Sequence, residues 1–187
     1  PASGNLEAGP AHIGEPHMKE SWNEIFEGVI KHEGGFVDHP ADPGGMTNLG
    51  VTRKVYSEWL GREATEGEMR RLTKEDVSPL YKKWYFDAVK ADDLPAGVDY
   101  FVVDVAINSG PRRAAKMLQK CVAAKPDGAI GPMTLRAVAD NDSTEVIEKL
   151  ANVRQDFYES LKTFKTFGKG WTRRNNEVRE HSLRMAK

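Results

Sequence analysis

The sequence predicts a mainly α protein, with two lobes of helices and a short β-hairpin after the first helix. Three observations carry this prediction. Apolar residues recur at helical spacing through most of the chain. Residues 34–50 instead gather glycines and prolines, which are typical of tight turns and short strands. The segment 91–97, ADDLPAG, interrupts the helical pattern again and predicts the boundary between the lobes.

Residues 1–17 are rich in Gly, Pro and Ala and lack apolar periodicity. The junction of His17 and Met18 is typical of a cloning scar before an initiator methionine, so we expect a tag, with a natural disordered leader as the alternative. The remaining stretch of about 170 residues is long enough for one two-lobed unit. We expect a first lobe over 18–95 and a second helical lobe over 96–187, packed on the first.

The first helix is predicted to begin at Ser21, because an S-x-x-E pattern can cap a helix start. Its apolar residues share one face, and they are Trp22, Ile25, Phe26, Val29 and Ile30. Continued for one more turn, this face carries Glu33, just before two glycines that end the helix. Apolar surroundings and a helix C-terminus both raise the pKa of a carboxyl group, so Glu33 could donate a proton near neutral pH. The alternative is a helix that ends one turn early, with Glu33 exposed or in a structural hydrogen bond.

The glycine-rich segment after this helix brings polar side chains towards Glu33. Asp38, Asp42, Thr47 and Asn48 lie within it. A buried acid facing a second carboxylate is what glycoside hydrolysis needs, because one group protonates the leaving oxygen and the other positions water or stabilises positive charge.

Residues 31–52, KHEGGFVDHPADPGGMTNLGVT, resemble the E-G-G-[YF]…D-P-G-G-x-T-N-x-G-[IV]-T signature of the glycoside hydrolase family 108 muramidases. These are lysozyme-like enzymes found as phage endolysins and as helpers of bacterial protein secretion. The resemblance implies an α+β lysozyme-like fold and makes Glu33 the catalytic acid. The order Glu, Asp, Thr also resembles phage-type lysozymes, which makes Asp42 and Thr47 the next catalytic candidates. Asn48 is a candidate for substrate contact.

After the hairpin, a helix is predicted over 51–60, and Thr65 and Thr73 are candidate caps for the turns that follow. Ser78 and Pro79 then read as an N-cap followed by proline at the first helical position, so we expect a fresh helix there.

Aromatic side chains crowd one side of that helix, at Tyr81, Trp84 and Tyr85. Aromatic rings stack on sugar faces and also fill protein cores. Tyr81 and Tyr85 are therefore candidates for substrate contact, with core packing as the alternative.

The run 99–109, DYFVVDVAINS, is too continuously apolar for a surface helix and predicts the central buried helix of the second lobe. Asp104 and Asn108 lie four residues apart on one face, with Phe101 nearby. We expect Phe101 and Asn108 to contact substrate, and the alternative for Asn108 is a structural hydrogen bond at the helix end.

Further helices are predicted over 112–122 and from Asp142 to a glycine-containing break at 167–171, with an exposed basic helix after it. Residues 94–139 resemble the predicted peptidoglycan domain that accompanies this hydrolase family. Its D-G-x-I-G-P-x-T element is, on physical grounds alone, a turn and an N-cap. The chain end also resembles the family, through F-x-x-F-G-x-G-W-x-x-R at 164–174.

The formal charge of the chain is −1, but residues from Arg154 onward carry nine Lys and Arg against four Asp and Glu. A basic end suits an anionic polymer such as peptidoglycan or nucleic acid, and an ordinary solvated helix face is the simpler explanation. We expect peptidoglycan glycan strands as the partner, no nucleic acid, and a monomer.

Several other classes fit poorly. Cys121 is the single cysteine, so no disulfide can form within the chain. The histidines lack zinc-ligand spacing, so we expect no metal and no cofactor. No apolar run reaches the roughly 18 residues of a membrane span. No signal peptide is visible, so we expect synthesis in the cytoplasm, with a holin or secretion machinery bringing the protein to the cell wall.

The leading hypothesis is an N-acetylmuramidase that hydrolyses the β-1,4 bond between N-acetylmuramic acid and N-acetylglucosamine. A lytic transglycosylase acting on the same bond is one alternative. A non-catalytic peptidoglycan-binding module or secretion adaptor is the other.

Overall fold

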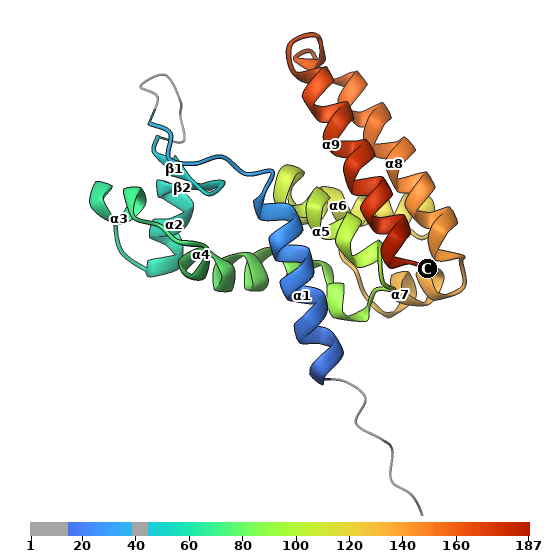
Figure 1. The fold of residues 1–187 in the computed structure, drawn as a ribbon. Helices are drawn as coiled ribbons and strands as arrows, with labels where there is room; N and C mark the ends of the chain where they lie inside the picture. Colours follow the sequence, from blue (N-terminus) through green and yellow to red (C-terminus); the bar gives the residue numbers. More distant parts are fainter. Residues whose placement is uncertain (1–14, 39–44) are drawn as a thin grey trace, which may run out of the picture.

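Helices make up most of the described structure, residues 15–38 and 45–187 of a computed structural model, with one small hairpin (Figure 1). The predicted mainly α fold is confirmed. We call the described elements before residue 95 the first lobe and the helices from Val98 onward the second lobe. Their division into domains stays a prediction, because helix α5 (Val98–Ser109) packs against elements of both lobes.

Helix α1 (Glu15–Ile30) carries the predicted apolar face, which is buried. Its predicted start at Ser21 is wrong, because the helix is already under way there. Instead of capping the helix, the Ser21 hydroxyl donates to Asp99 Oδ2 at 2.9 Å and ties α1 to the second lobe.

The hairpin pairs β1 (Thr47–Asn48) with β2 (Val51–Thr52) in antiparallel register. Between the strands, Leu49 and Gly50 have φ of 50° and 76°. Two positive φ values are typical of a two-residue type I′ turn, which matches the twist of the flanking strands.

The helix predicted over 51–60 begins only at Arg53, as α2 (Arg53–Leu60). Thr52 ends β2 and caps α2, because its side chain accepts from the Val55 N–H. Val51 therefore lies in a strand, where it is buried.

Helices α3 (Glu66–Arg70) and α4 (Lys74–Tyr81) both begin with capping boxes, at Thr65 and Thr73 as predicted. The fresh start predicted at Ser78 is wrong. The Thr73 box already satisfies the free N–H groups at the start of α4, so Pro79 falls inside the helix. The chain continues as the π-helical turn η1 (Lys82–Phe86) and the 3₁₀ turns η2 (Asp87–Val89) and η3 (Ala91–Asp93).

The second lobe is built around α5, whose predicted central position is confirmed by the burial of every residue from Val98 to Ala106. Around it lie α6 (Pro111–Cys121), α7 (Pro132–Ala139), α8 (Ser143–Ser160) and α9 (Phe164–Met185). Cys121 is buried on the inner side of α6. Helices α8 and α9 pair along their length and form an arm that projects from the second lobe (Figure 1).

The break predicted at 167–171 is wrong, because α9 runs through this segment and the chain turns instead at Leu161, which is extended. Gly168 serves packing rather than chain breaking. A Cβ there would lie 2.6 Å from the Phe164 ring. Nor is the rest of α9 simply an exposed basic helix, since Asn175, Val178 and Ser182 are buried.

The turn before α7 is held by one side chain. Gln119 donates to Asp127 Oδ1 and to Thr134 Oγ1, and accepts from the Gly128 N–H, at 2.9 to 3.1 Å. These contacts account for the D-G-x-I-G-P-x-T element as a structural turn.

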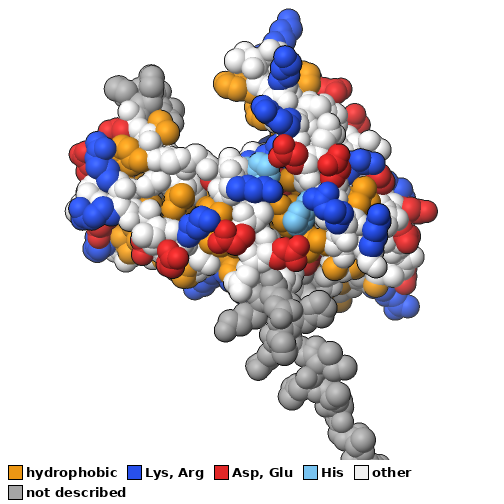
Figure 2. All heavy atoms as spheres, viewed as in Figure 1, with side chains coloured by type: hydrophobic (Ala, Val, Ile, Leu, Met, Phe, Trp, Pro, Cys, Tyr) orange, Lys and Arg blue, Asp and Glu red, His pale blue; other side chains and the backbone are white. Residues whose placement is uncertain are grey.

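The molecule is hollowed between the hairpin and the arm of α8 and α9 (Figure 2). The segment that follows α1 runs along the base of this hollow (Figure 1). None of the helices within the described ranges is long and apolar enough to cross a membrane.

Candidate active site

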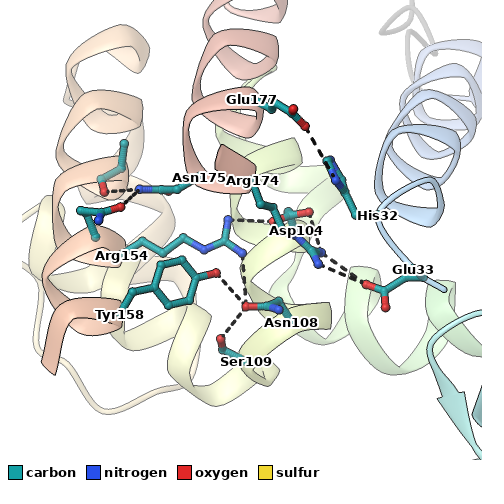
Figure 3. A network of polar contacts seen from close by, with 12 residues as sticks. His32, Glu33, Asp104, Asn108, Ser109, Arg154, Tyr158, Arg174, Asn175 and Glu177 are labelled. Atoms are coloured by element: carbon teal, nitrogen blue, oxygen red, sulfur yellow. Dashed lines mark hydrogen bonds and ion pairs between the residues drawn. The ribbon is translucent and has the colours of Figure 1, made fainter. Parts of the chain in front are cut away.

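Glu33 lies in the turn that follows α1, where the first lobe meets the second (Figure 3). The helix ends at Ile30, and the chain then turns through bonds from His32 N to Val29 O and from Glu33 N to Ile30 O, both 3.0 Å. The predicted helical placement of Glu33 is therefore wrong, and the early helix end is confirmed. Its side chain is nevertheless only 18% exposed.

The hairpin turn packs against the carboxyl group of Glu33. Leu49 N donates to Gly34 O at 3.0 Å, and the Tyr81 hydroxyl donates to Leu49 O at 2.8 Å. Gly50 lies so close that an added Cβ would be 2.5 Å from Glu33 Oε2 and 2.6 Å from the Tyr81 hydroxyl. A residue without a side chain is required at this point of the turn.

Arg174, from the middle of α9, approaches Glu33 from the opposite side. Its Nη1 and Nη2 atoms each lie 3.4 Å from Glu33 Oε1. The same guanidinium holds Asp104 of α5 with two shorter bonds, from Nε to Oδ2 at 3.2 Å and from Nη2 to Oδ1 at 3.0 Å. Arg174 thus bridges the two carboxylates (Figure 3).

Behind this bridge, Asp104 and Arg154 of α8 form a fully buried ion pair. Arg154 Nη1 lies 2.7 Å from Asp104 Oδ2, and both side chains have zero exposure. The Arg154 guanidinium also lies over the rings of Phe101 and Tyr158. This pair fixes the position of Asp104, and through it the position of Arg174.

Burial raises the pKa of Glu33, and Arg174 opposes that rise without cancelling it. Burial would also raise the pKa of Asp104, but Arg154 and Arg174 together bring it below its usual value. The two carboxyl groups therefore differ: Asp104 stays ionised, whereas Glu33 holds its proton to higher pH than an ordinary glutamate. A group of this kind can act as a general acid.

Neither arginine was predicted as a site residue, because both belong to the basic stretch of the sequence that indicates a solvated helix face. Arg154 lies four residues after buried Leu150, which places it on the buried stripe of α8. Arg174 is the last residue of the F-x-x-F-G-x-G-W-x-x-R pattern. These two signals could have identified them.

The second catalytic candidates are less well defined. Asp42 lies outside the described residues. Thr47 is half-buried in β1, and its backbone pairs with Val37 in both directions, at 2.7 and 2.8 Å. Asp38 is exposed beside this bridge. The catalytic roles of Asp42 and Thr47 stay predictions.

The substrate-contact candidates of the first lobe have different surroundings. Asn48 is buried and its amide donates to Met69 O at 2.9 Å, so it joins the hairpin to α3. Tyr81 is buried and supports the hairpin turn. Tyr85 is half-buried, with its ring 5.4 Å from that of Tyr81, and burial followed by the charge of Glu33 raises its pKa. Substrate contact stays a prediction for all three.

The two substrate-contact candidates on α5 differ in their exposure to solvent. Phe101 has zero exposure, so its predicted substrate contact is wrong and it belongs to the core. Asn108 is exposed, and its Oδ1 accepts from the Tyr158 hydroxyl at 2.8 Å and from Ser109 Oγ at 3.1 Å. These donors fix which way the amide points, and its Nδ2 group has no hydrogen-bond partner among the residues that the structure describes. Substrate contact by Asn108 stays a prediction.

Within residues 15–38 and 45–187, no three His, Cys, Asp or Glu side chains gather in a way that could hold a metal ion.

The sequence matches two family models in succession. The model described as glycosyl hydrolase 108 matches residues 26–110, and the model described as predicted peptidoglycan domain matches residues 113–176. A comparison with curated proteins gave no match.

Among solved structures, Brucella abortus SagA is similar to this chain. The two are 44% identical in sequence, with a TM-score of 0.82, over 90% of this chain and 97% of that one. The similarity therefore spans both lobes. Together with the two family matches, it shows that the chain belongs to the glycosyl hydrolase 108 family and is a peptidoglycan-acting hydrolase.

Proposed function

We propose that this protein is an N-acetylmuramidase, which hydrolyses the β-1,4 bond between N-acetylmuramic acid and N-acetylglucosamine in peptidoglycan. The observation that carries the proposal is Glu33, a mostly buried carboxyl with a raised pKa at the place where the two lobes meet (Figure 3). A protein that only binds the cell wall has no need for a carboxyl group in such surroundings.

Glu33 would donate its proton to the glycosidic oxygen as the bond to the sugar lengthens. Its Oε1 atom faces Arg174, which can only donate hydrogen bonds. The proton therefore resides on Oε2, next to the hairpin turn at Gly50. The substrate oxygen would approach from this side.

The developing positive charge on the sugar needs a partner, and we assign this role to Asp42 with help from Thr47. The assignment follows the resemblance to phage-type lysozymes, and the half-buried place of Thr47 in β1 is compatible with it. Whether the sugar configuration is retained or inverted depends on the separation of the two carboxyl groups.

A lytic transglycosylase on the same bond is the second candidate, because that reaction needs a single acid. One observation favours it. Among the described residues, the carboxylate whose charge acts on Glu33 is Asp104. Asp104 is fully buried between two arginines, so it cannot reach water or sugar and cannot serve as a second catalytic carboxylate. Mass analysis of the released fragments separates the two reactions, because hydrolysis adds water and transglycosylation leaves an anhydro sugar.

The acid assignment is tested by Glu33→Gln, assayed by clearing of purified peptidoglycan. The amide keeps the shape of the side chain but has no acidic proton, so we expect the rate to fall about a hundredfold to ten-thousandfold. Binding to sedimented peptidoglycan should be retained.

The matched control is Glu180→Gln, at an exposed position of α9. It should behave as wild type. If Glu33→Gln cleared cell walls at the wild-type rate, Glu33 would not be the acid. If wild type itself bound peptidoglycan without releasing fragments, the chain would be a binding module or secretion adaptor.

The setting of this activity is cell lysis or remodelling of the wall. We propose that a holin or secretion machinery brings the protein to its substrate.

A further inference from the structure

We propose that Arg174 is a positioning residue for Glu33, so that the second lobe completes the active site through α9. The inference rests on the proposed role of Glu33 as the acid. It adds that the region matched as a peptidoglycan domain has a part in the chemistry as well as in wall recognition.

The ion pairs cross between the two matched regions. Glu33 and Asp104 lie in the glycosyl hydrolase match at 26–110, whereas Arg154 and Arg174 lie in the peptidoglycan-domain match at 113–176. Glu33 and Asp104 are therefore each paired with a cation of the region that follows the hydrolase match.

The Arg174 guanidinium is fixed before any substrate arrives. Two bonds of 3.0 and 3.2 Å join it to Asp104, in the planar fork geometry that suits arginine and carboxylate. Asp104 is in turn held by Arg154 at 2.7 Å, and all three side chains are at least 87% buried. The chain of contacts leaves the guanidinium little freedom to move.

The contact from Arg174 to Glu33 is longer than the contact to Asp104. Both nitrogens lie 3.4 Å from Oε1, which is at the outer limit for a hydrogen bond. A close bidentate pair would keep Glu33 ionised and remove its proton. The longer contact orients Oε1 and leaves Oε2 free to carry the proton.

Charged and titratable groups face Glu33 from several elements of both lobes. They are Arg174 of α9, Asp104 of α5, Tyr81 of α4 and Tyr85 of η1, whereas the neighbouring His32 turns towards Glu177, with its Nδ1 atom 3.9 Å from Glu177 Oε2 (Figure 3). Burial raises the pKa of Glu33 and the charge of Asp104 raises it further, whereas Arg174 lowers it. An acid transfers its proton best when its pKa lies near the working pH, so the cation keeps burial from making Glu33 too weak an acid.

The test is Arg174→Met, which keeps most of the side-chain length but removes the charge. A general acid is active while protonated, so activity is lost on the alkaline side as Glu33 ionises. Without Arg174 the pKa of Glu33 rises, and the alkaline limb of the kcat/KM profile should move to higher pH. We also expect kcat to fall about a hundredfold, with KM for soluble peptidoglycan fragments little changed, because misplacing a catalytic group slows the reaction.

Two variants serve as controls. Arg173→Met removes the same charge from the exposed neighbouring position and should leave both the kcat and the pH profile as in wild type. Arg174→Lys keeps the charge, so the alkaline limb should return towards wild type, while kcat recovers only in part because an ammonium cannot form the fork.

A second measurement does not depend on catalysis. The carboxyl carbon of Glu33 is followed by NMR as a function of pH in wild type and Arg174→Met. The Glu33 midpoint should move to higher pH in the variant, and an unchanged midpoint overturns the proposal even if activity falls. If wild type releases no sugar fragments, the proposed function fails, and this titration still decides the role of Arg174.

Loss of Arg174 leaves Asp104 with one buried partner, so the fold of each variant is checked by circular dichroism. Should Arg174→Met not fold, Arg174→Gln is measured in its place, because its amide can still donate to Asp104 while carrying no charge. In that variant too, the Glu33 midpoint should move to higher pH, and an unchanged midpoint overturns the proposal.

Discussion

The two sides of the active site are built in different ways. On the first-lobe side, Glu33 lies in a turn and is enclosed by another turn, Leu49 and Gly50, through backbone contacts. On the second-lobe side, Arg174, Asp104 and Arg154 lie within long helices and form a buried network of side chains. The first side encloses the carboxyl group, and the second supplies the charges that orient its Oε1 atom and oppose the effect of burial on its pKa.

This difference teaches that the backbone enclosure of the carboxyl group and the charges around it can be altered separately. A change in the hairpin should displace the carboxyl group with little effect on the charges around it. A change in the helical network should alter charge and stability while the hairpin stays intact. Three predictions follow this division, from the largest expected effect to the smallest.

Asp104→Asn should have the largest effect on stability. It leaves two mostly buried arginines without their shared counter-charge, and removing one partner of a buried ion pair costs about 3–5 kcal/mol. Urea unfolding measures this loss. Asp156→Asn, at an exposed position of α8, is the control and should be close to wild type. A loss of similar size in both variants would show that the buried ion pairs contribute no more to the free energy of unfolding than an exposed carboxylate does.

Gly50→Ala should affect activity more than stability. The new Cβ would lie 2.5 Å from Glu33 Oε2 and push the carboxyl out of place, so we expect a loss of about a hundredfold in kcat. The positive φ of 76° adds strain of about 1–2 kcal/mol.

Gly61→Ala is the matched control for this strain. Gly61 has a similar φ of 70°, but an added Cβ there meets no atom within 4 Å. Backbone strain should therefore lower the free energy of unfolding of Gly61→Ala by about 1–2 kcal/mol, as it does in Gly50→Ala, while activity is kept. Equal losses of activity in the two variants would show that contact with the carboxyl is not the cause.

The smallest effect concerns pH and stability at Glu33. As the pH rises from the ordinary glutamate value of 4.5 to the raised pKa of the folded protein, the unfolded chain releases a proton that the folded chain keeps. The free energy of unfolding of wild type therefore falls across this window. Glu33→Gln lacks this fall, so its stability relative to wild type should increase with pH and then level off. Urea unfolding from about pH 4 to about pH 8 measures the difference, and a constant difference would contradict a raised pKa.

Local patterns predicted much of the fold. The apolar face of α1, the caps at Thr65 and Thr73 and the buried α5 each depend on neighbours within a few residues, and all were predicted. One error arose because a glycine can serve packing as well as chain breaking. Gly168 was expected to break a helix, yet it makes room for the Phe164 ring one turn earlier in the same helix.

The same reasoning explains what was predicted of the site. Glu33 could be found because its motif is continuous in the sequence, although the helix was expected to reach it. Arg174 could not be placed there from spacing alone, since 141 residues separate it from Glu33. Phe101 was misassigned because the sequence alone does not distinguish an aromatic side chain beside a cleft from one buried in the core, where Phe101 lies.

Cys121 has a consequence for how this protein reacts with oxidants. Its thiol is buried in α6, and burial raises its pKa to about 11. At neutral pH only about one thiol in ten thousand is therefore ionised, and the thiolate is the form that reacts with oxidants and disulfides. While the fold is intact, the Cys121 thiol should therefore react only slowly with oxidants and disulfides, and folding needs no disulfide within the chain.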